Sequence, residues 1–181
     1  MTKPESICSV RTAQLADAQQ IAAIHEKSRI RGYEGLMDWA LLNTTPFSER
    51  EANWVEQLNE AESHGKEIFV AEIDGHPVGF AVIGPEEGAD LHSEVAELDR
   101  IYVHPDHWNK GIGKILFRSC LGWLQARRQY KLLRLWTIGT NVRARRFYES
   151  LGFAFDGQTR SFGPYPEGVR YSVELAKLYS R

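Results

Sequence analysis

The chain of 181 residues is 43% hydrophobic, which fits one globular domain spanning residues 1–181 and excludes disordered and fibrous proteins. Its formal net charge of -2 gives no overall attraction to nucleic acid or to an anionic membrane, so any basic site must be local. Cys8 and Cys120 lie far apart without metal-ligand spacing, so we expect reduced thiols rather than a disulfide framework or a metal site. No apolar run suits a signal peptide or a membrane span, and we expect a cytoplasmic protein.

The first third of the chain predicts a strand followed by helices. The segment Ser6 to Arg11 is typical of a short strand, and Asp17 is a suitable N-cap for the amphipathic segment that follows. The stretch Arg29 to Trp39 contains two glycines that break the helical period, so we expect a loop there. Ser48 and Glu51 form a capping-box pattern, which predicts the start of another helix.

The rest of the chain alternates strands with helices. Asp74-Gly75 separates two β-rich runs and predicts a hairpin with a two-residue turn. The elements expected after it are a strand at 95–103, a helix from 112, a strand at 132–137, a helix at 141–150, and strands at 153–158 and 169–175. This order predicts a mixed α/β (α+β) domain.

The most informative segment is Leu98 to Lys114, where an apolar strand runs through a His-Pro turn into a glycine-containing helix start. Gly111 and Gly113 lack side chains, so a ligand can approach the backbone closely there. The first amides of the helix have no intrahelical partner, and together with the helix dipole they favour an anion such as a diphosphate. Structural glycines without a ligand are the alternative.

Two common phosphate motifs do not fit this segment. A P-loop needs glycine where Trp108 stands and Ser or Thr where Ile115 stands. A dinucleotide fingerprint needs a third glycine where Leu116 stands. A magnesium-nucleotide site and a dinucleotide site are therefore both disfavoured.

The strand before the turn has an irregular pattern. Strict alternation mixes charged and apolar side chains on both of its faces. One extra residue near Asp99 or Arg100 would form a β-bulge and return Leu98 to the side of Ile101 and Val103. Such a bulge also leaves backbone groups unpaired, where an amide-bearing ligand can bind.

A second motif lies downstream and reads Asn141-x-x-Ala144-x-x-Phe147-Tyr148-Glu149-x-Leu151-Gly152-Phe153. With this motif, the glycine turn and the preceding hairpin, the chain resembles the GCN5-related N-acetyltransferases (GNAT). The resemblance implies a central, mostly antiparallel twisted sheet of about seven strands, flanked by helices and splayed between the fourth and fifth strands. It also implies acetyl-CoA as the acetyl donor and no metal.

The resemblance assigns residues to the cofactor site. The backbone of the bulged strand would pair with the pantetheine arm, the turn would hold the pyrophosphate, and an asparagine on the next helix would contact the cofactor. The residues implied are Ile101, Tyr102 and Val103 for the strand, Asn109, Lys110, Gly111, Ile112, Gly113 and Lys114 for the turn, and Asn141 for the helix. Trp108 departs from the family pattern, which has Gln or Arg at that position. The departure should matter little, because backbone amides make most of the contacts with the pyrophosphate.

Two residues are the candidates for proton transfer. Tyr148 lies seven residues, nearly two helical turns, after Asn141, and the resemblance places it near the thioester sulfur, where a phenol can protonate the leaving thiolate. Glu97 is the candidate base for the acceptor amine, with a water chain or a solvated carboxylate without a role as alternatives. Trp136 occupies the place where some family members carry a glutamate.

The acceptor pocket of the family is formed by the loop after the first helix and the loop between the last two strands, which are Arg29 to Trp39 and Ser161 to Gly168 here. Within them Arg31, Tyr33, Glu34 and Trp39 are candidates for holding a polar, carboxylate-bearing amine. Ordinary surface-loop chemistry explains these residues equally well.

The expected activity is direct acetyl transfer to a small-molecule amine, amino-acid-like or antibiotic-like, within a ternary complex. The alternatives left open are a protein, peptide or polyamine acceptor and a non-catalytic acyl-CoA-binding module. We expect no nucleic-acid or membrane partner. Dimerisation is common in the family, so the resemblance also admits a homodimer.

Overall fold

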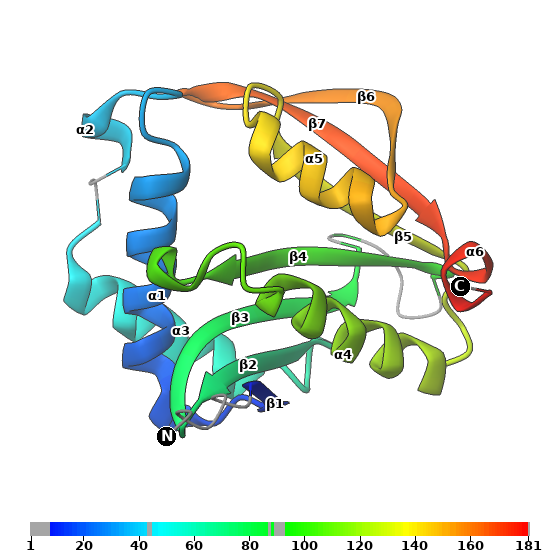
Figure 1. Cartoon of the computed structure of the whole chain (residues 1–181), viewed down its shortest axis with the longest axis horizontal. Helices are drawn as coiled ribbons and strands as arrows, with labels where there is room; N and C mark the ends of the chain where they lie inside the picture. Colours follow the sequence, from blue (N-terminus) through cyan, green and yellow to red (C-terminus); the bar gives the residue numbers. More distant parts are fainter. Residues whose placement is uncertain (1–7, 43–44, 87, 89–92, 181) are drawn as a thin grey trace, which may run out of the picture.

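The computed structural model describes residues 8–42, 45–86, 88 and 93–180. A seven-stranded sheet in the order β1-β2-β3-β4-β5-β7-β6 forms its centre (Figure 1). The strands are β1 (Cys8–Thr12), β2 (Glu67–Ile73), β3 (His76–Pro85), β4 (Val95–Val103), β5 (Leu132–Ile138), β6 (Ala154–Phe162) and β7 (Tyr165–Glu174). The helices are η1 (Leu15–Asp17), α1 (Ala18–Gly32), α2 (Trp39–Leu42), α3 (Phe47–Glu60), η2 (Pro105–His107), α4 (Ile112–Ala126), α5 (Val142–Leu151) and α6 (Leu175–Tyr179).

The sheet is splayed in its middle. All neighbouring strands are antiparallel except β4 and β5, which are parallel. Their ladder contains only three pairs, from Val95 opposite Leu132 to Glu97 opposite Arg134, although both strands continue further. In Figure 1, β5 to β7 meet β4 near α6 and diverge from it toward the other end of the sheet. The predicted mixed α/β fold with a splay between the fourth and fifth strands is confirmed.

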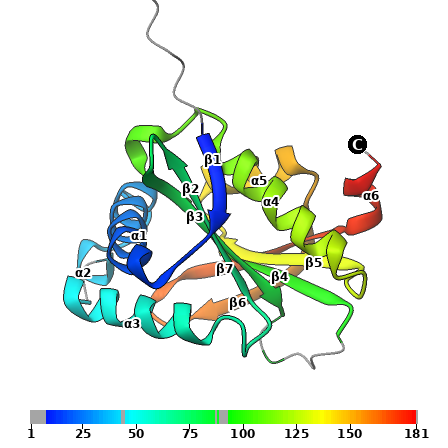
Figure 2. The same cartoon turned by 90° about the horizontal axis from the view of Figure 1, so that it is seen from below.

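The helices cover the two faces of the sheet (Figure 2). Helices α1 and α3 pack on one face, where Ile21 and Trp54 are buried against Phe80 of β3. Helix α4 packs on the other face, where Leu116 lies in one cluster with Leu98 of β4. Burying such side chains contributes about 1.5–3 kcal/mol each, so these two cores fix α1 and α4 on opposite sides of β4.

The predicted β-bulge is present at Asp99. Val82 of β3 pairs with Arg100 and Ile83 pairs with Leu98, so Asp99 is the extra residue on β4. Leu98 is buried in the α4-side cluster, and Ile101 and Val103 pack against the same cluster. The bulge thus restores one apolar side to a strand whose sequence alternates irregularly.

Several local predictions are also confirmed. Ile73 pairs with His76 across the turn at Asp74 and Gly75, both of which have positive φ, as this two-residue hairpin requires. Strand β1 covers the described part of the predicted first strand, whose residues 6 and 7 lie outside the described residues. Asp17 is the N-cap position of α1, although its carboxylate binds other groups.

Three local predictions are wrong. The first helix does not stop before Arg29 but continues to Gly32, because a glycine in the last turn costs a helix only about 1 kcal/mol. Helix α3 begins at Phe47 after Pro46, without a side-chain cap, so Ser48 does not cap it. The segment expected as a loop between the last two strands is largely strand, because β6 and β7 pair up to Phe162 opposite Tyr165.

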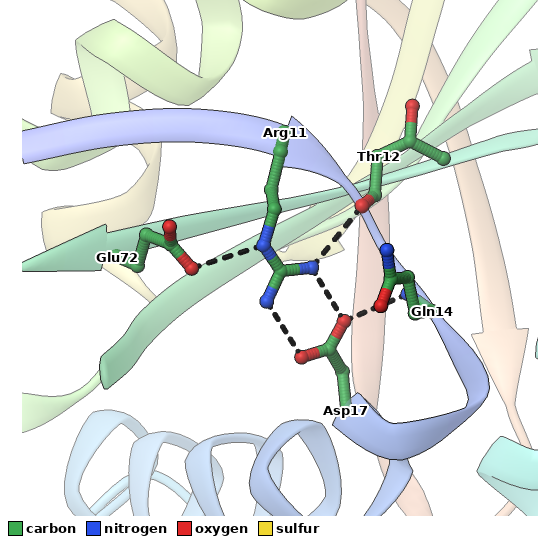
Figure 3. A network of polar contacts seen from close by, with 5 residues as sticks. All are labelled: Arg11, Thr12, Gln14, Asp17 and Glu72. Atoms are coloured by element: carbon green, nitrogen blue, oxygen red, sulfur yellow. Dashed lines mark hydrogen bonds and ion pairs between the residues drawn. The ribbon is translucent and has the colours of Figure 1, made fainter. Parts of the chain in front are cut away.

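One polar network joins β1 to the neighbouring strand β2 and to η1 (Figure 3). Arg11 donates to both carboxylate oxygens of Asp17 at 2.7 and 2.8 Å and to Glu72 of β2 at 3.0 Å. Asp17 also accepts from the backbone N–H of Gln14 at 2.7 Å. These bonds, led by the one from Arg11, hold the pKa of Asp17 below its usual value despite burial.

Among the described residues, no helix has the length and apolar character needed to cross a membrane. The same part of the chain contains no cluster of three or more His, Cys, Asp and Glu side chains arranged to hold a metal ion.

Candidate active site

A cavity of about 580 Å³ lies where β4 diverges from β5. Its walls come from the second half of β4, the start of α4, one side of α5 and the end of α1. Most residues that the sequence analysis assigned to the cofactor line it: Ile101, Tyr102, Val103, Asn109, Gly111, Ile112, Gly113, Lys114 and Asn141. Lys110 is exposed and is not part of this wall. One cavity thus brings together two motifs about thirty residues apart in the sequence.

The second half of β4 forms one wall of the cavity, and other elements hold its backbone in place by hydrogen bonds. Beyond Glu97, β4 forms no ladder with the described residues of β5. The carbonyl of Val103 accepts hydrogen bonds from Ser28 Oγ of α1 at 2.9 Å and from Trp108 Nε1 at 2.6 Å. Backbone groups at such an edge can pair with an extended, amide-bearing ligand.

The two glycines of the turn serve different purposes. Gly111 caps α4 with φ of +79°, and a Cβ at this position would meet no atom within 4 Å. A Cβ on Gly113 would lie 3.0 Å from the ring of Phe147, so this glycine allows α4 and α5 to approach each other. Asn109 also adopts a positive φ, of 62°, which asparagine tolerates better than most residues. The helix start therefore faces open space, with its first amides available to an anion.

Helix α5 presents its predicted residues to the cavity. Asn141 is its N-cap, and Oδ1 accepts from the N–H of Ala144 at 3.0 Å, while the buried side chain lines the wall. Tyr148 lines the same cavity nearly two turns later. Burial and the neighbouring Tyr102 raise the pKa of Tyr148 far above its ordinary value, so its phenol stays protonated at neutral pH.

Tyr33, at the end of α1, brings a third phenol to this wall. Its pKa is raised well above the usual value, first by Tyr102 and then by burial. Tyr33, Tyr102 and Tyr148 thus come from three different elements and meet at one cavity. All three are hydrogen-bond donors that act without carrying charge.

The aromatic residue that departs from the family pattern is part of the site. Trp108 lines the cavity, and the guanidinium of Arg143 lies over its ring at 3.6 Å from the centroid. Burial lowers the pKa of Arg143 from its ordinary value. A cation is therefore held over Trp108 in the wall of the cavity that the glycine turn also lines.

The two carboxylates of β4 differ in position. Glu97 is 9% exposed, lies between Gly84 and Arg134 in the sheet, and is not among the residues that line the cavity. Asp99, the bulge residue, does line it and lies 3.4 Å from Lys66 Nζ and 3.9 Å from Arg100 Nε. Of these two carboxylates, only Asp99 is exposed to the cavity.

A second cavity, of about 200 Å³, adjoins the first, and both are lined by Tyr33, Trp136 and Thr137. Its other walls come from Arg29 and Met37 near the end of α1, and from Ile138, Phe162 and Tyr165. The two segments that the sequence analysis assigned to the acceptor pocket, 29–39 and 161–168, therefore meet at this place.

The individual acceptor candidates are distributed differently. Tyr33 lines both cavities. Arg31 and Glu34 form an ion pair with each other, are largely exposed and line neither cavity. The side chain of Trp39 lies outside what the structure describes.

Sequence reasoning placed Arg29 in an acceptor-pocket segment without naming it as a candidate, and it missed Thr137 and Arg143 as wall residues. For Arg29 a signal was present, because it precedes Tyr33 by four residues and such pairs share one face of a helix. The early end predicted for the first helix hid this relation. Thr137 and Arg143 carry no such signal, since their exposure to the cavity depends on the splay.

The comparisons with known proteins agree with this geometry. The model of the acetyltransferase (GNAT) family matches residues 33–153. A probable N-acetyltransferase of Mycobacterium tuberculosis is 28% identical over 179 residues, which are 98% of this chain and 96% of the relative. The L-amino acid N-acyltransferase MnaT of Escherichia coli is 29% identical over 157 residues, covering 86% of this chain and 84% of that protein.

Solved structures show the same fold. The crystal structure of PaiA N-acetyltransferase from Thermoplasma acidophilum in complex with coenzyme A superposes with a TM-score of 0.77 at 17% identity, covering 93% of this chain and 99% of that one. The family match spans more than half of the chain and includes both motifs of the main cavity. This chain therefore belongs to the acetyltransferase (GNAT) family of enzymes.

Proposed function

We propose that the protein transfers the acetyl group of acetyl-CoA directly to the amine of a small molecule, with both substrates bound at once. The observation that carries the proposal is the 580 Å³ cavity, which combines a strand edge without a described partner, an open helix start and a half-buried tyrosine. Each of these features matches a different part of the donor: the amide-rich pantetheine arm, the pyrophosphate and the thioester.

The residues fit acetyl-CoA in a consistent order along the wall. The backbone of Ile101 to Val103 would pair with the pantetheine arm, because this edge has no strand partner on its β5 side among the described residues. The turn from Asn109 to Lys114, including Lys110 at its surface, would hold the pyrophosphate on the α4 amides. Asn141 would contact the cofactor from α5, and Arg143 would add positive charge nearby.

In the transfer step, the free amine attacks the thioester carbonyl carbon, and the carbon–sulfur bond breaks. The thiolate that leaves needs a proton, and Tyr148 is our proposed donor. Its raised pKa keeps the phenol protonated over the working pH range. The buried phenol has no charge to desolvate before it donates.

The amine must lose a proton, and Glu97 is our proposed final acceptor through a water chain. Its burial where β4 and β5 begin to diverge, two residues before Asp99 of the cavity wall, supports a role without direct contact with the amine. A water-mediated route is consistent with its absence from the cavity wall. Glu97 therefore acts as a proton acceptor at a distance rather than as a group that binds the amine.

The acceptor is proposed to be an amino-acid-like amine. The second cavity is small, with a volume equal to roughly six or seven times a water molecule's share of the liquid. The E. coli relative, named an L-amino acid N-acyltransferase, supports this class of acceptor. Part of the acceptor wall comes from Tyr33, which also lines the main cavity together with Tyr148.

Calorimetric titration with acetyl-CoA, followed by a panel of amines with free thiol monitored in the same cell, tests the proposal. Binding together with amine-dependent thiol release is the expected result. Binding without release for any amine would instead indicate a non-catalytic acyl-CoA-binding module. Release with peptide amines alone would move the acceptor to the protein class, and no binding would refute the cofactor site.

A further inference from the structure

The acceptor side of the site contains an arginine that forms no ion pair with a described carboxylate. Arg29 lines the second cavity, and its side chain is only partly exposed. No described carboxylate forms an ion pair with it, whereas Arg31, two residues later on the same helix, pairs with Glu34 on the surface. A partly desolvated guanidinium without a counter-ion can form a strong, bidentate ion pair when a ligand supplies a carboxylate.

The surroundings of Arg29 are aromatic and carry further positive charge. Trp136, Phe162 and Tyr165 line the same cavity. The guanidinium of Arg160 lies 4.2 Å from the ring centroid of Trp136 and 4.4 Å from that of Phe162. No carboxylate of the described residues lines this cavity. The cavity therefore combines apolar walls with a positive field.

We propose that the second cavity recognises the carboxylate and the side chain of an α-amino acid, with Arg29 binding the carboxylate and the aromatic walls holding an apolar or aromatic side chain. This inference rests on the proposed function, because it concerns the acceptor of the same reaction. The walls shared by the two cavities then direct the amine toward Tyr148. Arg29 is a specificity-determining residue that does not touch the reacting atoms.

The same chemistry disfavours two other acceptor classes. A polyamine brings several positive charges next to Arg29 and Arg160 and finds no carboxylate among the described cavity residues. A large antibiotic exceeds a cavity of 200 Å³ and would leave most of its contacts outside it. An amine that lacks the carboxylate loses the charged contact with Arg29.

The first test compares matched acceptors on the full-length protein. L-phenylalanine, L-leucine and L-methionine are each assayed beside the corresponding amine without the carboxylate, and spermidine is included. At equal free-base concentration, kcat/KM for at least one amino acid should exceed that of its decarboxylated amine by about 10-fold to 100-fold, the range of one hydrogen-bonded ion pair. Equal values within every pair, or a preference for spermidine, would overturn the inference.

The second test uses variants of the two arginines. Arg29→Gln should raise KM for the preferred amino acid by about 10-fold to 100-fold, with little change in kcat and none for the decarboxylated amine. Arg29→Lys should restore part of the loss because it keeps the charge without the bidentate geometry. Arg31→Gln tests the arginine that the sequence analysis favoured and should leave KM unchanged; the reverse result would assign the carboxylate to Arg31.

A binding measurement separates this inference from the proposed function. CoA-loaded protein is titrated calorimetrically with the same amino acids, and the affinity of each variant for acetyl-CoA reports its folding. Binding that Arg29→Gln abolishes, without turnover by the wild type, would support the carboxylate site and refute the transferase. Turnover that depends neither on the acceptor's carboxylate nor on Arg29 would support the transferase and refute the carboxylate site. If the wild type shows neither binding of the amino acids nor turnover, both the carboxylate site and the transferase are refuted.

Discussion

Two arginine sites near the start of the chain show opposite uses of the same side chain. Arg11 donates to Asp17 and to Glu72, so its charge is balanced within the protein (Figure 3). Arg29, one helix further on, lines a cavity and has no ion pair with a described carboxylate. The first arrangement stabilises the fold, because each polar group already has a partner. The second leaves an interaction to be completed by a ligand.

The comparison extends beyond the arginines. In the Arg11 network, the carboxylate of Asp17 accepts hydrogen bonds from the Arg11 side chain and from the backbone N–H of Gln14. Around the cavities, His107 Nδ1 is buried without a hydrogen-bond partner, and the α4 helix start opens onto space that a Cβ at Gly111 would not fill. Incomplete polar contacts are therefore present at the cavity wall, although Arg50 Nε, Arg134 Nε and Arg160 Nε are also buried without a hydrogen-bond partner among the described residues. Variants in the two regions should separate effects on activity from effects on stability.

The largest expected effect is on the rate of acetyl transfer by Tyr148→Phe. Removing the phenol oxygen takes away the proposed proton donor, and kcat should fall about 10²-fold to 10⁴-fold. The affinity for acetyl-CoA and the unfolding midpoint should change little, because the ring and its contacts with Phe153 and Tyr171 remain. Steady-state kinetics beside calorimetric binding measures both.

The pH dependence of kcat provides a second test of the role of Tyr148. Because the pKa of Tyr148 is raised, the wild type should show no loss of kcat from phenol ionisation up to about pH 10, the ordinary tyrosine value. Unchanged turnover of Tyr148→Phe across the working pH range would remove this residue from catalysis.

A smaller loss of rate is expected for Glu97→Gln. This change removes the charge and keeps the shape, and kcat/KM at neutral pH should fall about 100-fold, the lower end for general base catalysis. Raising the pH should recover part of the rate, because the amine then loses its proton to solvent. Asp99→Asn is the matched variant two residues later, and a larger loss there would make Asp99, which lines the cavity, the proton acceptor.

In the Arg11 network the expected effect is on stability and not on rate. Asp17→Asn should lower the free energy of unfolding by about 1–3 kcal/mol, the range for hydrogen bonds to a charged group. Urea unfolding measures this loss, and kcat should remain that of the wild type. The exposed carboxylate variant Glu34→Gln should lose less than about 1 kcal/mol, because its partner Arg31 is also largely exposed. Equal losses in the two variants would contradict a special role for the network.

The same network predicts a dependence on acidity. The pKa of Asp17 is lower in the folded protein than its ordinary value of 3.8, so its contribution is fully present above that value. The contribution is lost as the pH falls through the folded-state pKa. The stability difference between wild type and Asp17→Asn should therefore be constant above about pH 5 and shrink below pH 4.

The sequence predicted the backbone of the site better than its side chains. The hairpin at Asp74-Gly75, the bulge at Asp99 and the glycine turn follow from local rules of turn chemistry and alternation, and the first two are confirmed by the strand pairing. These features depend on a few neighbouring residues. They can therefore be inferred without knowledge of the tertiary structure.

The acceptor wall could not be predicted in the same way. It depends on where α1 ends and on how β5 to β7 diverge from β4, which are tertiary properties. Because residues 29–39 were expected to form a loop, the helical phase that separates Arg29 from Arg31 could not be inferred. Residues two apart on a helix lie about 200° apart around its axis, so this small error in the boundary exchanged a surface position for a cavity position.

The smallest expected effect concerns the contact that joins α1 to the cofactor wall. Ser28→Ala removes the hydrogen bond from Ser28 Oγ to the Val103 carbonyl, and the loss of stability should be about 0.5–1.5 kcal/mol, because Trp108 still donates to that carbonyl. Ser150→Ala is the matched control, since its hydroxyl donates to the Phe147 carbonyl on the exposed side of α5. Water replaces the exposed Ser150 bond more readily than the part-buried Ser28 bond, so urea unfolding should detect a larger loss for Ser28→Ala. A rise in KM for acetyl-CoA in the same variant would indicate that α1 also positions the β4 edge, whereas equal losses in both serine variants would show that burial at this contact adds nothing.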